Sequence, residues 1–409
     1  MLGFSNFGSR GWVRTRTELH HLLAVRNRAG GWLGARTVFV TEASLNDDGY
    51  MMEGECKAER PKVPPVPISH QDLPEFPDFG NLRTVDTISF HECTIAMETD
   101  YQYYELFGDL NAATSYLTTL LSYISDRYEL QTNTVLTFPY LQLYTNSNDP
   151  WSTPDNGGGS IDMLNEFVNA WQGNVPTGAI LGHLMSGASL GGGVAYLNGI
   201  CSNSSNFGVS GNIGYQGFVN FPVVQQPANW DFIVVAHEIG HNFGSPHTHD
   251  FCPPLDECPA SQYWGSCQTQ QVCSSSGSIM SYCHLCPGGT GNITTYFHPE
   301  AAALMTSVAQ SCTPSIWEVT INAPDVVSDS SGTPTTLQTV SGNVNSATVY
   351  YRLAGQSAFT SMALSAQGGG LFQVDLPATP CGESLEYYFD FDVAGTGTFS
   401  APNGAPTAL

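Results

Sequence analysis

Basic side chains are scarce in this sequence of 409 residues, which has 12 Lys and Arg against 36 Asp and Glu. Ten of the 12 basic residues lie before Thr84 together with 10 of the acidic ones, so residues 1–83 are neutral. Residues 84–409 carry the whole net charge of −24. A surface of that sign repels phosphate backbones, which excludes nucleic-acid binding and favours solubility.

Long apolar runs are missing from the start of the chain as well. Arginines are spread through residues 1–34, and the longest apolar run there, around Leu22–Val25, is too short for a secretory signal or a membrane span. The 11 cysteines, nine of them from Cys93 to Cys312, nevertheless indicate an oxidising compartment. We therefore expect a secreted, extracellular protein on the basis of its cysteines and its acidity.

The run AHEIGHNFGSPHTHD contains a complete set of residues for a catalytic zinc site. Residues four apart share one face of a helix, so His237 and His241 aim their imidazoles at one ion, with Glu238 beside the first as a general base. Gly244 ends the helix in a left-handed turn and returns His247 as third ligand. Three protein ligands leave zinc an open position for water, as catalytic sites do. The alternative is an amphipathic core helix with chance histidines.

These residues resemble the signature of the metzincin zinc endopeptidases. Ser278–Tyr282 resembles the Met-turn of that family, which implies that Met280 lies beneath the three histidines. Residues 94–101 and 191–201 resemble the first strand and the cleft-bordering strand region of adamalysin-like (reprolysin) proteases. The resemblance covers roughly residues 84–314 and implies a mixed sheet with an active-site helix, a zinc cofactor, and protein or peptide substrates.

Two positions depart from the adamalysin pattern. Adamalysins carry an aspartate directly after the third histidine, whereas this chain has Thr248 there and an acid only at Asp250. Tyr282, two residues after the turn methionine, is similar to a tyrosine of astacins and serralysins, which implies a catalytic role on the metal or at the oxyanion. A core tyrosine packed under the site is the alternative.

Six cysteines crowd into a segment too rich in Ser, Gly and Pro to form its own core: Cys252, Cys258, Cys267, Cys273, Cys283 and Cys286. Disulfides are therefore expected to hold this segment, in a pairing that the sequence leaves open. The resemblance to adamalysins implies one bridge elsewhere, from Cys201 to Cys312. Cys283 and Cys286 have a second interpretation as half of a structural zinc site, although no second such pair lies nearby.

A chain of this length exceeds one ordinary core, and its composition divides it into three parts. Residues 1–82 are interpreted as a propeptide remnant and a proline-rich linker. Residues 83–315 are interpreted as an α+β catalytic domain. Residues 316–409 contain short β-branched and aromatic segments, which predict a small all-β sandwich of fibronectin type III or immunoglobulin type, as an accessory module expected to be incomplete.

Hydrophobic periodicity locates some elements of the catalytic domain. Residues 112–128 and 299–312 show the spacing of amphipathic helices, and residues 134–144 are typical of a strand. In the third part, strands are expected around 347–352, 372–376 and 385–391.

Cys56 lies just before the proline-rich linker. A single propeptide cysteine ahead of a zinc site suggests a cysteine switch, in which its thiolate fills the open zinc position until cleavage and keeps the protein a zymogen. A disulfide to Cys93 is the alternative.

The leading hypothesis is a secreted, monomeric zinc endopeptidase, in which Glu238 moves a proton from water to the leaving amine. The glycine-rich segment 191–196 is expected to pair with an extended substrate. Two alternatives are a binding or adhesion protein that keeps a protease fold without activity, and a zinc hydrolase with a non-peptide substrate. Calcium is a second candidate cofactor, with Glu98 and Asp100 as candidate ligands. The alternative is that these two carboxylates are solvated or cap a helix.

Overall fold

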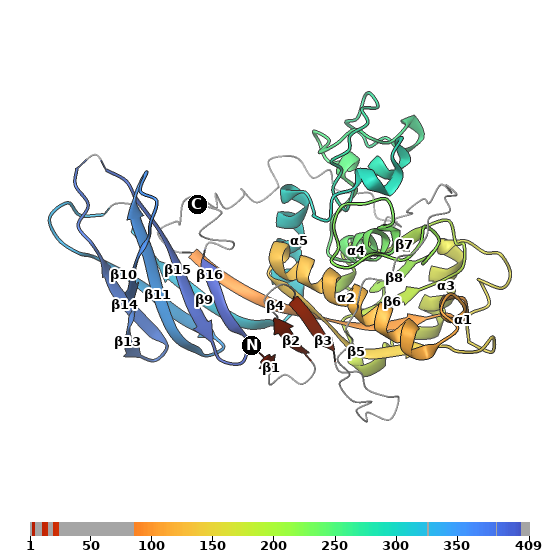
Figure 1. Ribbon diagram of the computed structural model, residues 1–409, viewed down its shortest axis with the longest axis horizontal. Coiled ribbons are helices and arrows are strands. Elements are labelled where there is room, and N and C mark those ends of the chain that lie inside the picture. Colours follow the sequence, from red (N-terminus) through yellow and green to blue (C-terminus); the bar gives the residue numbers. More distant parts are fainter. Residues whose placement is uncertain are drawn as a thin grey trace. The chain divides into compact units, whose positions relative to one another are not determined.

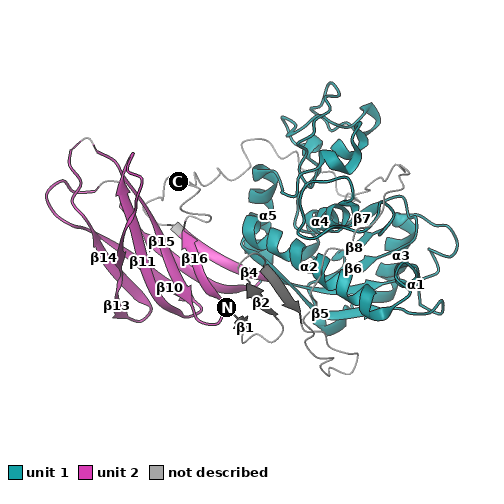
Figure 2. Ribbon diagram, viewed as in Figure 1, with its two compact units in different colours: residues 1–4, 8–74, 93–313 teal, residues 5–7, 75–92, 314–409 magenta. Residues whose placement is uncertain are grey.

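The computed structural model describes residues 2–4, 10–14, 19–23, 86–324, 327–381 and 383–401. Cys56 and most of the expected propeptide and linker lie outside these ranges. The chain divides into two compact units, whose described parts lie mainly in residues 93–313 for one and in residues 86–92 and 314–401 for the other (Figure 2). Near the N-terminus, three short strands pair antiparallel: β1 (Leu2–Phe4), β2 (Arg10–Arg14) and β3 (Leu19–Leu23).

The first unit is built on a mixed sheet in the order β4, β6, β8, β7, with β5 also paired to β4 (Figure 1). Its strands are β4 (Asp86–Thr99), β5 (Thr134–Leu143), β6 (Leu181–Met185), β7 (Gly193–Ala195) and β8 (Phe207–Ser210). β4, β6 and β8 run parallel, and β7 runs antiparallel to β8. Every residue of β6, β7 and β8 is buried, as in strands covered on both faces. Among the described strands, β7 is at the end of the order and so forms an edge.

The helices described in this unit are α1 (Tyr101–Glu105), α2 (Leu110–Thr132), α3 (Ser160–Trp171), α4 (Trp230–Asn242) and α5 (Pro299–Cys312). The helix expected at 299–312 is confirmed and begins with a proline, which needs no hydrogen-bond partner in the first turn. α2 is longer than the expected 112–128. Asp109 starts it by accepting from the Ala112 amide at 2.8 Å, and Asn133 ends it in a left-handed conformation.

Short 3₁₀ turns connect these elements at Pro176–Gly178, Gly199–Cys201, Thr248–Asp250, Ser261–Tyr263, Cys283–Leu285 and Gly289–Asn292. Among the described residues, no helix combines the length and the apolar character that crossing a bilayer requires.

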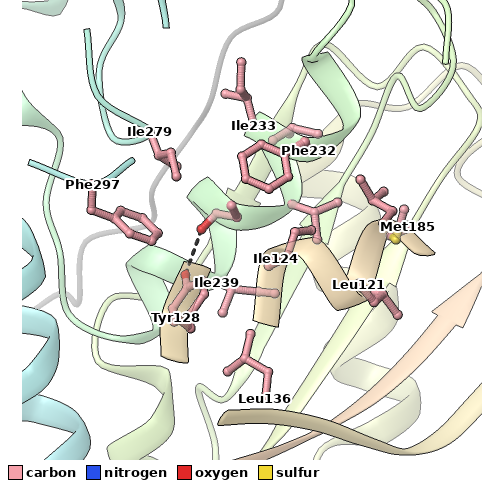
Figure 3. Close-up of a cluster of buried hydrophobic side chains, with 14 of the residues drawn as sticks. Leu121, Ile124, Tyr128, Leu136, Met185, Phe232, Ile233, Ile239, Ile279 and Phe297 are labelled. Atoms are coloured by element: carbon pink, nitrogen blue, oxygen red, sulfur yellow. Dashed lines mark hydrogen bonds between the residues drawn. The ribbon is translucent and has the colours of Figure 1, made fainter. Parts of the chain in front are cut away.

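Helix α4 lies in the middle of the core of this unit. All 13 of its residues are buried, so it has no solvent-exposed face. Phe232 belongs to one apolar cluster with Leu121 and Ile124 of α2, and burial of each such side chain stabilises the fold by about 1.5–3 kcal/mol (Figure 3). The Tyr128 hydroxyl of α2 donates to the Ala236 carbonyl at 2.8 Å. This packing and the hydrogen bond to Ala236 hold α4 in place at the residue before His237. Helix α4 also packs on β7 and β8.

Four disulfides link described residues of the first unit. Cys201 pairs with Cys312, which confirms the bridge that the adamalysin resemblance implied. The six crowded cysteines pair as Cys252–Cys267, Cys258–Cys283 and Cys273–Cys286, within the loops drawn above α4 in Figure 1. Cys283 and Cys286 are thus each bound in a separate disulfide. Their interpretation as half of a structural zinc site is wrong, because a disulfide sulfur has no thiolate to offer a metal.

The second unit is all-β. One sheet has the order β13, β14, β10, β9 and then residues 86–91 of β4; the other has the order β12, β11, β15, β16. The strands are β9 (Ser315–Asn322), β10 (Thr333–Ser341), β11 (Val344–Leu353), β12 (Thr360–Ala363), β13 (Ser365–Gly368), β14 (Leu371–Leu376), β15 (Leu385–Val393) and β16 (Gly397–Ala401). The ring centroids of Trp317 in β9 and Phe391 in β15 lie 5.1 Å apart, so the two sheets share a core.

Strand β4 differs from the strand expected at 94–101. It begins at Asp86 and ends at Thr99, and its residues 86–91 pair with β9 while residues 95–99 pair with β6. Asp100 then starts helix α1 by accepting from the Tyr103 amide. The strand is longer because its first half finds a partner more than 200 residues away in the sequence, which leaves no local signal.

Candidate metal centre

Helix α4 and the turn after it bring the three predicted ligands together. His237 and His241 are one helical turn apart on α4, with ring centroids 4.8 Å apart. Gly244 follows with a φ of +94°, and a Cβ there would lie 2.5 Å from the Asn198 side-chain oxygen. A larger residue would be strained and would collide, so glycine is required to turn the chain. The turn brings His247 back, with its ring centroid 4.7 Å from that of His241.

The three imidazoles converge on one point through their Nε2 atoms. Ligand atoms of His237, His241 and His247 all lie within 4.8 Å of one another, and the Nε2 atoms of His241 and His247 are 3.1 Å apart. All three residues are buried. The His237 Nε2 is a buried nitrogen without a hydrogen-bond partner among the described residues.

Each ring is oriented by an acceptor at its other nitrogen. His237 Nδ1 donates to the Ile279 carbonyl at 2.7 Å, and His241 Nδ1 donates to the Ser245 carbonyl at 2.7 Å. His247 Nδ1 faces a carboxylate oxygen of Asp250 at 3.3 Å. Because carbonyl and carboxylate oxygens only accept, the ring proton is on Nδ1 and each Nε2 presents a lone pair.

This arrangement fits a zinc ion. Lone pairs on two Nε2 atoms 3.1 Å apart repel each other unless a cation lies between them. Burial lowers the pKa of His237, and lowers those of His241 and His247 to about 3, which favours the neutral imidazole that binds metal. Three neutral nitrogen donors are the set typical of a catalytic zinc site with an open position.

The predicted Met-turn lies directly under α4. Ser281 donates its amide to the Ser278 carbonyl at 2.9 Å, which closes the turn, and Met280 within it is fully buried. A Cβ on Gly240, between the two helix histidines, would lie 2.6 Å from the Met280 sulfur. The Thr248 amide donates to the Met280 carbonyl at 3.1 Å. The turn is therefore fixed both to the ligand helix and to the segment that carries the third histidine.

Glu238 is buried beside the first histidine and lies against strand β7. A Cβ on Gly193 of β7 would lie 2.3 Å from a Glu238 carboxylate oxygen, so only glycine leaves room for the carboxylate there. From the sequence, this glycine-rich strand was assigned to substrate pairing, and its contact with Glu238 was not predicted. The three successive glycines at 191–193 are visible in the sequence. The contact of Gly193 with Glu238 of α4 is a tertiary contact, which spacing along the chain does not reveal.

Tyr282 packs beside the histidines and is only 3% exposed. Its ring centroid lies 4.5 Å from that of His247 and 6.4 Å from that of His237. The rings of His249, His284 and Tyr263 also surround it, at 4.9, 5.5 and 5.6 Å. The structure thus brings Tyr282 to the site, in a position compatible with a packing role and with a catalytic one.

The structure gives no support to Glu98 and Asp100 as calcium ligands. Asp100 accepts from the Tyr103 amide at 2.8 Å, from the Gly187 amide at 3.0 Å, and from the Ser186 hydroxyl. Burial raises its pKa to about 6, with these hydrogen bonds opposing the shift. Neither Asp100 nor Glu98 belongs to any of the groups of metal-ligating side chains that come together in the described part of the chain. Asp100 is the cap of α1, which is the alternative that the sequence analysis gave.

Comparison with known proteins gives a family match over about half of the chain. Residues 90–296 match the model of metallo-peptidase family M12 (Reprolysin_5). No curated protein matches the chain. Of the solved structures, that of a chaperone–substrate complex is 16% identical over 55% of this chain and only 36% of that chain, with a TM-score of 0.30. An engineered protein is 10% identical over 76% of this chain and 92% of its own, with a TM-score of 0.18. Likenesses as weak as these two say nothing about the fold.

Proposed function

Since the chain belongs to metallo-peptidase family M12, we propose that it is a secreted zinc endopeptidase that binds the ion through His237, His241 and His247 and uses Glu238 as its general base. The observation that carries this proposal is the convergence of three imidazole Nε2 atoms, each with its Nδ1 facing a fixed acceptor. Glu238 follows His237 in α4 and is also buried.

The roles of the chain's own groups follow from these positions. When bound, zinc supplies Lewis-acid polarisation of the scissile carbonyl and lowers the pKa of water. Glu238 accepts the proton of the attacking water and passes it to the departing amine nitrogen. Gly193 of β7 has no side chain and so leaves room for this carboxylate. Tyr282 donates its hydroxyl to the oxyanion that forms at the attacked carbonyl.

An edge strand beside the base favours an extended peptide as substrate. β7 lies at the end of the described strand order and contacts Glu238 through Gly193. A peptide paired along such an edge would have its main chain held by hydrogen bonds and a carbonyl delivered to the base. Protein or peptide substrates are therefore the substrate class of this proposal.

We also propose a domain organisation, a location and an oligomeric state for the protein. Residues 1–82 are a propeptide and linker that keep the protein a zymogen, residues 83–315 the catalytic domain, and residues 316–409 an accessory module of fibronectin type III or immunoglobulin type. Two facing sheets within an all-β unit support the last assignment. Four disulfides support an extracellular location, because such bonds persist in oxidising compartments. We propose a monomer.

A proteolysis assay with metal removal tests the function. We expect the mature protein to degrade casein or gelatin, to lose that activity in a chelator such as 1,10-phenanthroline, and to regain it when zinc is added back. The physical reason is that the three histidines have no other means of polarising a carbonyl. Proteolysis that persists after all zinc is removed would refute the proposal. A zinc-loaded protein without proteolysis would instead indicate the binding protein or a non-peptide hydrolase.

A further inference from the structure

The third histidine is oriented by a different kind of partner from the other two. His237 and His241 each donate Nδ1 to a main-chain carbonyl, which any residue would supply. His247 instead faces the carboxylate of Asp250 at 3.3 Å, which only an acidic side chain supplies. We propose that Asp250 is the positioning residue of the third zinc ligand, and that its carboxylate fixes the His247 tautomer and strengthens the binding of zinc.

The local backbone explains why the acid stands three residues after the histidine. His247 has extended backbone angles and is followed by the 3₁₀ turn Thr248–Asp250. In a 3₁₀ turn, side chains at i and i+3 lie above one another, and the Asp250 amide donates to the His247 carbonyl at 3.0 Å. An acid directly after the histidine would point away from the ring in this turn. The carboxylate therefore reaches Nδ1 only from position 250.

The first residue of the turn, Thr248, is held in place by hydrogen bonds. The Thr248 amide donates to the Met280 carbonyl, and its hydroxyl approaches the same oxygen at 3.4 Å. The Leu255 amide donates to the Thr248 carbonyl at 2.9 Å. Thr248 thus ties the turn to the Met-turn, while the negative charge is carried by Asp250. This division of roles accounts for the threonine directly after the third histidine in this chain.

The His247–Asp250 contact is largely buried, unlike an ion pair on the surface. The side chains of His247 and Asp250 are only 10% and 20% exposed, so water screens them weakly. On the ring's other side, His249 stacks against His247 with centroids 5.1 Å apart and planes 9° apart. A carboxylate behind a ligand imidazole raises its basicity toward the metal, and loss of such partners typically weakens metal binding about 10- to 100-fold.

Zinc affinity of the full chain tests this inference, which rests on the proposed zinc site but not on catalysis. The dissociation constant is measured by competition with a chromophoric chelator for the wild type, Asp250→Asn and Asp250→Ala. The matched control is Asp256→Asn, which removes the same charge from the same cysteine-rich segment. We expect Asp250→Ala to weaken zinc binding about 10- to 100-fold. Asp250→Asn should weaken it less, because its amide oxygen still accepts from Nδ1, and Asp256→Asn should leave it unchanged.

Denaturant unfolding of the metal-free variants separates this role from a structural one. We expect the metal-free midpoints of wild type and Asp250→Asn to coincide, because the asparagine oxygen still accepts from His247 Nδ1 and the lost charge strengthens binding only when the ion is present. Equal zinc affinity in all variants would overturn the inference while leaving the zinc site intact. A wild type that binds two zinc ions, with one lost in Asp250→Asn, would also overturn it, since Asp250 would then be a direct ligand with His249. A wild type that binds no zinc would refute the proposed function itself.

Discussion

At the scale of single residues, the proposed catalytic role of Tyr282 depends on its hydroxyl alone. Its ring packs on His247, with the two ring centroids 4.5 Å apart. A phenylalanine keeps the ring and its packing and removes only the hydroxyl. If the hydroxyl stabilises the oxyanion, its removal costs transition-state binding without affecting the metal.

We therefore expect Tyr282→Phe to lower kcat/KM for a peptide about 100-fold, which is the usual loss for an oxyanion donor, at an unchanged zinc content. The measurement is steady-state cleavage of a quenched fluorescent peptide. Tyr263→Phe is the control, since that ring lies 5.6 Å from Tyr282 and has no proposed role. An unchanged kcat/KM in Tyr282→Phe would assign the residue to core packing alone.

The sequence predicts some residues of the site but not the contacts that orient them. The spacing of His237, Glu238 and His241 on one helix is a local property, so the motif locates them directly. The acceptors behind the His241 and His237 rings are the main-chain carbonyls of Ser245 and Ile279. Any residue type would supply such a carbonyl, so the sequence does not reveal it. Asp250 was visible as a displaced acid, but only the 3₁₀ turn shows which atom it faces.

At the scale of elements, local patterns predicted α5 to the residue and located most of α2 and β5. Each has strong internal periodicity or a capping residue. The first half of β4 was missed because it pairs with β9, which lies far along the chain. β10 and β13 were missed because one is rich in threonine with little alternation, and the other is fully exposed.

The disulfide between the turn Gly199–Cys201 and the end of α5 has a testable energetic role. Cys201 and Cys312 are 111 residues apart, so the bond closes a long loop in the unfolded chain. We expect the double variant Cys201→Ser/Cys312→Ser to lose about 2–5 kcal/mol of unfolding free energy, measured by urea denaturation at fixed zinc concentration.

Zinc affinity in that variant should change little, because all three ligands lie within one short segment of α4 and the following turn. Cys381→Ser is the control, since Cys381 is exposed and forms no disulfide. A double variant as stable as Cys381→Ser would show that the bridge adds nothing to the stability of the fold.

At the scale of the whole molecule, charge and architecture divide the chain in similar places. The neutral stretch before Thr84 ends just before the first residue of β4, and the acidic remainder contains most of the described residues of both compact units. Composition predicted an α+β part followed by an all-β part, and the structure has both. It did not predict that residues 86–91 pair with a strand of the all-β unit, because pairing over such a distance depends on the folded chain.

Peptide-bond hydrolysis by Glu238 at a zinc site is the central claim, and one paired measurement tests it. Zinc content and turnover of a peptide substrate are measured on the same samples of wild type and Glu238→Gln, with Glu300→Gln in α5 as the matched control. Glutamine has nearly the shape of glutamate but accepts no proton at neutral pH. One bound zinc is expected in all three proteins, together with a fall in kcat of about 100- to 10,000-fold in Glu238→Gln alone. A Glu238→Gln protein that retains its zinc and cleaves the peptide as fast as the wild type would contradict it.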